Sequence, residues 1–177
     1  EAGGLLAAKM YGPPVRPPQP SSGLTAAFGS GIDWQPSQGD DRYRRGLYTF
    51  WRRTVPYPSM TTFDAPSREI CTVRRFRTNT PLQAFVTLND PVYVEAAQAL
   101  ARRIVREGGA DPESRVRFAL KLCLARPAND AQTRALLDLY ESEARHYREH
   151  PDAARALATE PLGPLEPNAD PADLAAW

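Results

Sequence analysis

The 177-residue chain contains few cysteines, few histidines and no long apolar run. Its two cysteines form neither a CxxC nor a CxxCH motif, which excludes a zinc ribbon and a covalent haem site. Mean hydropathy is −0.50, and no apolar run approaches the ~18 residues that a membrane-spanning helix needs. We therefore expect no membrane span and no cofactor in this chain. For Cys71 and Cys123, a disulfide and two free thiols both remain open.

The two ends of the sequence are typical of a piece of a longer protein. Glu1 stands where an initiator methionine is expected, and the first residues do not have the pattern of a signal peptide. At the other end, Asp170-Pro171 has the pattern of a helix start, but the chain stops at Trp177 before a turn or two is complete. We expect further sequence on both sides.

Proline, in contrast, is abundant: 18 residues, roughly twice the average share of about 5%. This number excludes a long uninterrupted helix bundle and a regular repeat. Residues 1–40 look irregular, and the run from Gly12 to Pro20 favours an extended polyproline conformation. Apolar side chains further along favour a segment that lies over a neighbouring domain. They are Leu24, Phe28, Ile32 and Trp34.

Residues 41–55 (DRYRRGLYTFWRRTV) have an ambiguous pattern. Tyr43, Leu47 and Phe50 fit a helical period, whereas the run Leu-Tyr-Thr-Phe-Trp has the composition of a strand. We predict a short helix, which Pro56 and Pro58 end. Residues 56–80 combine prolines, serines and threonines with aromatic and charged side chains, and this mixture predicts an ordered loop.

Four helices are predicted between residues 81 and 150. Three begin at a Thr-Pro or Asp-Pro pair, in which the first residue caps the helix and the proline fits its first turn. The four starts are Thr80-Pro81, Asp90-Pro91, Asp111-Pro112 and Asn129-Asp130. Apolar positions recur at the helical period after each start, and the first helix carries Leu82, Phe85, Val86 and Leu88. Pro151 ends the fourth helix.

These patterns predict a mainly α fold. The connections between the helices are short, which predicts antiparallel neighbours. We expect an antiparallel helical bundle over about residues 81–150, with an N-terminal half that is irregular and rich in proline, arginine and aromatic residues. Residues 1–80 are then a wrapping segment, and residues 81–177 the helical part, of a single domain.

Arginines gather in residues 42–77, where nine of them alternate with aromatic side chains. Arginine and aromatic side chains together bind phosphate and stack on bases, so a nucleic-acid surface is one interpretation. However, the formal net charge is only +1, and nucleic-acid-binding domains are usually strongly basic. We favour internal salt bridges and predict no nucleic-acid partner.

His146 and His150 form an H-x-x-E-H pattern with Glu149, the inverted zinc-protease motif. Two histidines four positions apart lie on one face of a helix, as a zinc site requires. Against this, His150 precedes Pro151 at a helix end, and two flanking arginines repel a cation. We favour a solvated, charged helix face and predict no metal site.

Carboxylates, guanidiniums and amides gather around two helix starts between Asp64 and Asp90. Free backbone N–H groups at helix starts favour anions, so a small anionic or carbohydrate ligand fits there. Capping and loop hydrogen bonds are the competing interpretation, because Thr80 and Asp90 already have capping roles. No G-x-S-x-G elbow or phosphate-binding glycine loop is present, so catalytic residues stay unknown. The candidate binding residues are Asp64, Arg68, Glu69, Arg77, Asn79, Gln83, Asn89 and Asp90.

Four long motifs carry a resemblance to a known family. They are residues 12–20 (GPPVRPPQP), 43–56 (YRRGLYTFWRRTVP), 62–69 (TFDAPSRE) and 77–91 (RTNTPLQAFVTLNDP). Together they resemble the C-terminal part of the planctomycete-type domain of unknown function 1553 (DUF1553), also called PSD1. The resemblance covers essentially the whole chain, and the two histidines of the zinc pattern lie outside these motifs.

The resemblance implies an extracytoplasmic protein, periplasmic or at the cell surface. Such domains usually end large exported bacterial proteins that often also carry a cytochrome c domain and the companion domain of unknown function 1549. No activity comes with the resemblance, and its link to polysaccharide degradation rests on genomic setting. We therefore expect a non-catalytic accessory or interaction domain that packs against the missing N-terminal domains of its parent protein, rather than an enzyme. The alternative is a domain that binds or degrades polysaccharide or anionic glycan through the Asp64–Asp90 region.

Overall fold

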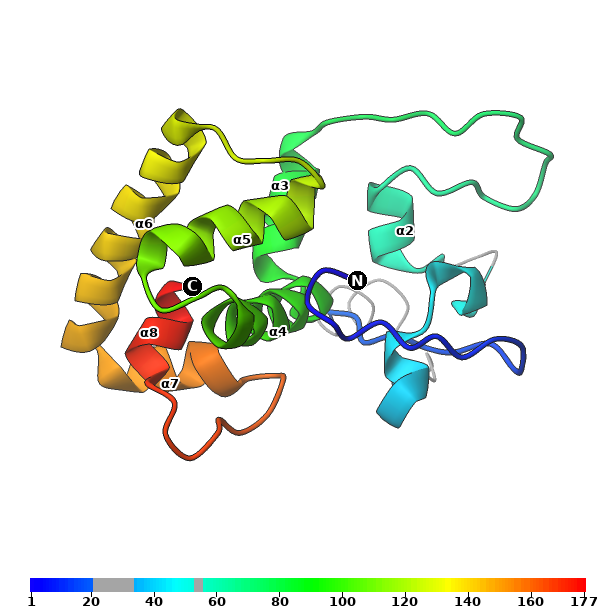
Figure 1. The fold of residues 1–177 in the computed structure, drawn as a ribbon. Coiled ribbons are helices and arrows are strands. Elements are labelled where there is room, and N and C mark those ends of the chain that lie inside the picture. The colour runs from blue at the N-terminus through cyan, green and yellow to red at the C-terminus, as the bar shows by residue number, and fades with distance from the viewer. Residues whose placement is uncertain (21–33, 53–55) are drawn as a thin grey trace. The chain divides into compact units, whose positions relative to one another are not determined.

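The computed structural model describes residues 1–20, 34–52 and 56–177. Over these residues the regular structure is helical (Figure 1). The described residues form two isolated β-bridges and no β-strand beyond them. The prediction of a mainly α fold is confirmed. Contacts divide the chain into two compact units, which we describe one at a time. The N-terminal unit is Leu6–Val94, and the C-terminal unit is Glu1–Leu5 with Glu95–Trp177.

All four helices predicted between residues 81 and 150 form. They are α3 (Pro81–Asn89), α4 (Pro91–Glu107), α5 (Pro112–Leu124) and α6 (Asp130–Glu149). The side chains of Thr80, Asp111 and Asn129 each accept a hydrogen bond from a backbone N–H of the first turn that follows. Such caps satisfy donors that a helix start leaves free, which is why short local motifs located these starts.

The four helices are divided between the two units. The α3 helix belongs to the N-terminal unit, α5 and α6 belong to the C-terminal unit, and the division falls near the start of α4. The bundle predicted over residues 81–150 is therefore divided as well. That residues 1–80 and 81–177 act as a single domain stays a prediction.

Three further helices begin at a proline. They are α2 (Pro58–Thr62), α7 (Pro151–Thr159) and α8 (Pro171–Ala176). The predicted start of α8 is confirmed. Pro151 ends α6 as predicted, but it also occupies the first position of α7, where the missing N–H of proline is not needed. The sequence pattern missed α7 and α2 because we took their prolines only as breakers.

The prediction of one short helix over residues 41–55 is wrong for the described residues. Two short 3-10 helices occur there instead, η2 (Gly39–Tyr43) and η3 (Gly46–Tyr48). The reason lies far away in the sequence: Arg44 forms a bridge with Ala7, and Thr49 forms one with Val15. Backbone groups that pair with a distant segment are not available for helical hydrogen bonds.

The proline-rich segment runs extended beside these 3-10 helices in the N-terminal unit (Figure 1). Of the apolar residues expected to hold it, Trp34 stacks on Tyr57 with ring centroids 5.8 Å apart. Leu24, Phe28 and Ile32 lie outside the described residues. The wrapping segment thus lies against the chain's own aromatic residues.

In the C-terminal unit, α8 packs against both α6 and α7. Asp173 of α8 accepts hydrogen bonds from Tyr140 Oη (2.6 Å) and Trp177 Nε1 (3.2 Å) through Oδ1, and from Arg115 Nη1 (3.3 Å) through Oδ2. The rings of Tyr140 and Trp177 stack with centroids 4.4 Å apart. One carboxylate therefore ties α5, α6 and α8 together.

We expect Tyr140→Phe to lower the free energy of unfolding by about 1 kcal/mol at pH 7, because it removes one hydrogen bond and keeps the ring. Burial, followed by the hydrogen bond to Asp173, raises the pKa of Tyr140 to about 12 from an ordinary value of 10.0. A pKa raised by folding means that this stability is complete below pH 10 and is lost as the pH rises towards 12.

Denaturant unfolding at pH 7 and pH 11 measures both effects. Tyr147→Phe is the matched control, because it removes a hydroxyl from the same helix without removing a bond to Asp173. An equal loss of stability in the two variants would contradict the role assigned to Asp173.

Candidate functional site

Asp64 closes the long connection between α2 and α3, residues 63–80. Its Oδ2 accepts hydrogen bonds from the backbone N–H (2.8 Å) and the hydroxyl (2.7 Å) of Thr78. The backbone of Asp64 is left-handed, with φ at 58°, a conformation that aspartate tolerates better than most residues. The Thr78 hydroxyl, followed by the Thr78 N–H, lowers the pKa of Asp64 from its usual 3.8. The carboxylate is therefore ionised at neutral pH and already hydrogen-bonded.

Arg75 ties the later part of the connection back to its beginning. Its Nε donates to the carbonyl oxygen of Asp64 (2.8 Å), and its Nη2 donates to the carbonyl oxygen of Phe63. Figure 1 shows the connection as a long arc that stands away from α2 and α3. The sequence did not single out Arg75, because nothing local distinguishes it from the other arginines of residues 42–77.

Gln83 attaches the beginning of α3 to the end of α2 and to the connection. It forms a capping box with Thr80, and its Nε2 donates to the carbonyl oxygen of Thr62 (2.9 Å) and to the hydroxyl of Thr78 (3.0 Å). The residue is buried, with 8% of its surface exposed. Two of the predicted site residues, Asp64 and Gln83, therefore meet at Thr78.

Asp90 is also buried, and both of its carboxylate oxygens are used. Oδ1 accepts the backbone N–H of Val92 (2.9 Å) at the start of α4, and Oδ2 accepts the hydroxyl of Ser59 on α2 (2.9 Å). Burial, followed by the negative charge of Asp90, raises the pKa of both Tyr57 and Tyr93. Asp90 thus joins α2 to the start of α4, apart from the cluster at Thr78.

Two further candidates lie on the connection itself. The guanidinium carbon of Arg68 lies 5.1 Å from the ring centroid of Trp51. The backbone N–H of Glu69 donates to the hydroxyl of Ser67 (3.3 Å). The first contact places the guanidinium of Arg68 over Trp51, and the second is made by the backbone of Glu69.

The last three candidates are exposed. Asn89 donates from Nδ2 to the carbonyl oxygen of Phe85 in its own helix (2.9 Å). Arg77 and Asn79 make no hydrogen bond or ion pair with any described residue. The structure therefore brings two of the eight candidates, Asp64 and Gln83, together at Thr78.

An open cavity of about 530 Å³ is lined by the connection. Its described lining includes Asp64, Arg74, Arg75 and Phe76, and Asp64 is the one carboxylate among these lining residues. Most glycosidases place two carboxyl groups on either side of the bond that they cleave. The described lining does not present such a pair.

The α3 helix turns its polar side inward and its apolar side to solvent. Leu82, Phe85 and Leu88 are 61%, 67% and 74% exposed, whereas Gln83 is buried. The helical period places Phe85 and Leu88 on the side opposite Gln83. We call Leu82, Phe85 and Leu88 the α3 apolar face. The sequence marked these positions as apolar, but it did not indicate that they face outward.

A sequence model of the PSD1 family, described as a protein of unknown function (DUF1553), matches residues 1–140. This chain belongs to the PSD1 family. The matched residues include all eight candidates and the α3 apolar face, and the match ends within α6. No curated protein and no solved structure matches the chain at a significant level.

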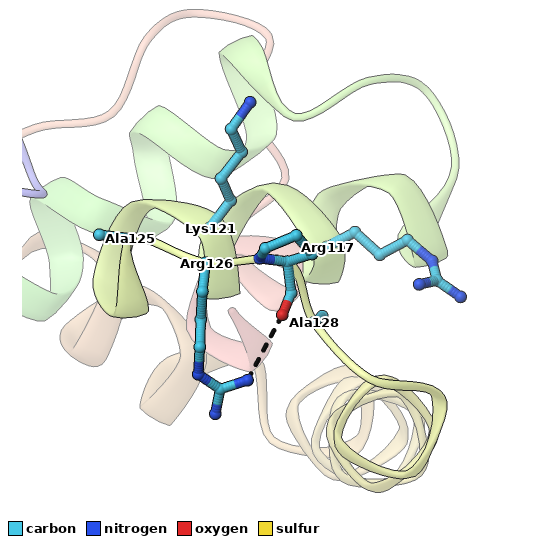
Figure 2. Close-up of a pocket in the computed structure, with 6 residues that line it drawn as sticks. Arg117, Lys121, Ala125, Arg126 and Ala128 are labelled. Atoms are coloured by element: carbon cyan, nitrogen blue, oxygen red, sulfur yellow. Dashed lines mark hydrogen bonds between the residues drawn. The ribbon is translucent and has the colours of Figure 1, made fainter.

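This PSD1 chain has a second cavity, of about 420 Å³, beside the end of α5. Arg117, Lys121 and Arg126 line it, but Figure 2 shows their charged groups pointing in three different directions. Arg117 is also paired with Glu113 (2.9 Å) and Asp130 (3.0 Å). Guanidinium and ammonium groups that diverge in this way do not converge on one anion.

The other features raised by the sequence are also placed. The rings of His146 and His150 stack with centroids 4.4 Å apart, and His150 Nδ1 lies 2.8 Å from the carbonyl oxygen of His146. Within the described part of the chain, no three His, Cys, Asp or Glu side chains group closely enough to hold a metal ion. Cys71 and Cys123 are free and exposed. No helix among the described residues has the length and apolarity to cross a membrane.

We expect Asp64→Asn to loosen the connection at neutral pH. The amide has the same size and tolerates the left-handed backbone, but it lacks the charge that strengthens both hydrogen bonds from Thr78. Because folding lowers the pKa of Asp64, its contribution is present at neutral pH and is lost as the pH falls below 3.8 through the depressed pKa.

Amide hydrogen exchange of residues 65–78 from pH 7 to pH 2, well below the ordinary pKa of 3.8, tests this. The variant should lose protection relative to the wild type at pH 7, and the two should converge in acid. Thr78→Ser, which keeps the hydroxyl, should behave like the wild type. A difference between Asp64→Asn and the wild type that is the same at every pH would rule out the charge as its cause.

Proposed function

We propose that this PSD1 chain is a non-catalytic interaction domain of an exported multidomain bacterial protein, and that it docks onto another domain of that protein. The observation that supports this proposal is the α3 apolar face. Three large apolar side chains are exposed by a helix whose buried residue is a glutamine. Apolar surface of this kind marks protein–protein contacts more often than it marks ordinary solvent-facing surface.

The energy available from the α3 apolar face is large. Burying one leucine or phenylalanine side chain contributes about 1.5–3 kcal/mol relative to leaving it exposed. About two thirds of the surface of each of the three residues is exposed, so together they offer roughly 3–6 kcal/mol before the costs of association. The helix cannot simply roll over to hide them, because the hydrogen bonds of Gln83 to Thr62 and Thr78 would break and leave buried polar groups unsatisfied.

The connection adds further exposed apolar side chains to the docking surface. Ile70, Val73 and Phe76 are all more than 70% exposed. Between and beside them, Arg74 and Arg77 are exposed and form no ion pair with any described residue. Arginine is favoured at protein interfaces. This composition fits a partner surface that is apolar with an acidic edge.

The carboxylates support a non-catalytic role. A general acid or base must reach a proton on the substrate. Asp90 is instead buried with both oxygens hydrogen-bonded, and Asp64 receives two hydrogen bonds that close the connection. Both acids therefore hold the scaffold that presents the α3 apolar face.

The test measures binding of the chain to the remainder of its parent protein. We expect Phe85→Asp and Leu88→Asp each to weaken binding roughly 30-fold, the equivalent of about 2 kcal/mol. The same variants should leave the unfolding midpoint of the isolated chain almost unchanged, since both side chains are already exposed.

Leu139→Asp is the matched control, because Leu139 is 54% exposed on α6 and lies outside the α3 apolar face. It should leave binding intact. Unchanged binding in both α3 variants, or an equal loss in the control, would contradict the docking proposal.

Glycan binding is the second candidate function, and the cavity of the connection is the observation that favours it. Asp64, Arg74 and the exposed ring of Phe76 line that cavity, and carboxylate, guanidinium and aromatic groups are all suited to sugars and their anionic fragments. A screen of oligosaccharides against the chain and its parent tests it. If the docking proposal is correct, none should bind, whereas binding that is lost in Phe76→Ala would favour the glycan candidate.

A further inference from the structure

Residues 15–18 of the N-terminal unit lie in a site that satisfies every backbone polar group they have. Val15 donates to the carbonyl oxygen of Tyr48 (2.8 Å) and accepts from the N–H of Phe50 (2.7 Å). Arg16 donates to the hydroxyl of Ser37 (3.0 Å) and accepts from the N–H of Ser37 (2.8 Å). These hydrogen bonds satisfy the backbone N–H and carbonyl groups of both Val15 and Arg16.

The two prolines that follow have only carbonyl oxygens to satisfy. Trp34 Nε1 donates to the carbonyl oxygen of Pro17 (2.8 Å), and Tyr57 Oη donates to that of Pro18 (2.7 Å). The rings of Trp34 and Tyr57 stack 5.8 Å apart at 17°, and Phe50 lies 6.3 Å from Trp34. Aromatic side chains that donate hydrogen bonds to a proline-rich backbone are the means by which several peptide-binding domains hold extended ligands.

The preceding residues are held in the same way, through their backbone. Arg44 is buried, and its guanidinium donates to the carbonyl oxygens of Lys9, Tyr11 and Pro13 while lying 3.6 Å from the ring centroid of Tyr48. Most side chains of residues 7–14 are exposed to solvent, among them that of Tyr11, which is 81% exposed.

Among residues 7–20, two side chains are buried, those of Val15 and Pro18. Backbone hydrogen bonds supply affinity for almost any extended chain, whereas buried side chains select the sequence. The site therefore recognises an extended backbone in which an aliphatic residue is followed, three positions later, by a proline.

We infer that Trp34, Arg44, Phe50 and Tyr57 form a binding site for an extended proline-rich peptide, occupied in this structure by residues 15–18 of the chain itself. The ligand is a segment of another protein with the same pattern. Residues 15–18 compete with it from within the chain, so the site is available to the degree that this segment is displaced. This site is separate from the α3 apolar face.

A fluorescent peptide with the sequence of residues 7–20 (AAKMYGPPVRPPQP) tests the inference. The wild-type chain should bind it weakly, because a tethered segment competes at an effective concentration in the millimolar range. Val15→Asp weakens the tethered segment and leaves the site intact, so it should bind the peptide at least about tenfold more tightly.

Tyr57→Phe, added to Val15→Asp, keeps the ring and removes one donor, whereas Trp34→Phe in the same background removes the indole donor and leaves a smaller aromatic ring. Each should weaken peptide binding roughly threefold to tenfold. A peptide that itself carries the Val15→Asp change should not bind. The inference is overturned if the folded Val15→Asp chain does not bind the peptide, or if neither Trp34→Phe nor Tyr57→Phe weakens peptide binding.

Should Val15→Asp fail to fold, a protease site placed between residues 20 and 34 of the wild-type chain allows the same test. After cleavage, the labelled peptide should exchange with the released segment. Exchange should be faster with Tyr57→Phe, because the released segment loses a hydrogen bond and dissociates sooner. A cleaved chain that keeps its own segment and takes up no peptide at millimolar concentration would overturn the inference.

Discussion

The hydrogen bonds of Gln83 and Asp90 determine which way α3 faces, and the exposed apolar face of this PSD1 chain depends on them. Both side chains are buried, and a buried polar group is costly unless its hydrogen bonds are made. Thr62, Thr78 and Ser59 provide those bonds. Once Gln83 is fixed inward, the helical period places Phe85 and Leu88 outward. The apolar face is therefore a consequence of a satisfied polar side.

The helix starts were predictable from the sequence because capping is local. Thr80, Asp111 and Asn129 each bond a residue three positions on, so a short motif contains the whole interaction. The side of α3 that is buried was not predictable in this way, because Gln83 is held by Thr62, which lies far away in the sequence. The same limit explains the wrong helix over residues 41–55, where Val15 and Ala7 decide the backbone.

The composition of the sequence located the candidate site, and the structure shows that its residues belong to different junctions. The sequence indicated that Asp64 and Asp90 belong to one polar region, and it left capping and ligand binding open. In the structure each acid is used in a different junction: Asp64 closes the connection, and Asp90 joins α2 to α4. The residues that carry the proposed function are apolar neighbours of these acids, and a search for chemically reactive side chains does not select them. The proline-rich segment shows the same principle, since its carbonyl oxygens, rather than its side chains, are recognised by Arg44, Trp34 and Tyr57.

In the proposed function, the α3 apolar face and the connection are covered by another domain of the parent protein. Amide hydrogen exchange of residues 70–89, compared between the isolated chain and the intact parent, tests it most directly. These residues should exchange slowly in the parent and faster in the isolated chain, with little change in α6, which belongs to the C-terminal unit. Equal exchange rates over residues 70–89 in the two proteins would contradict it.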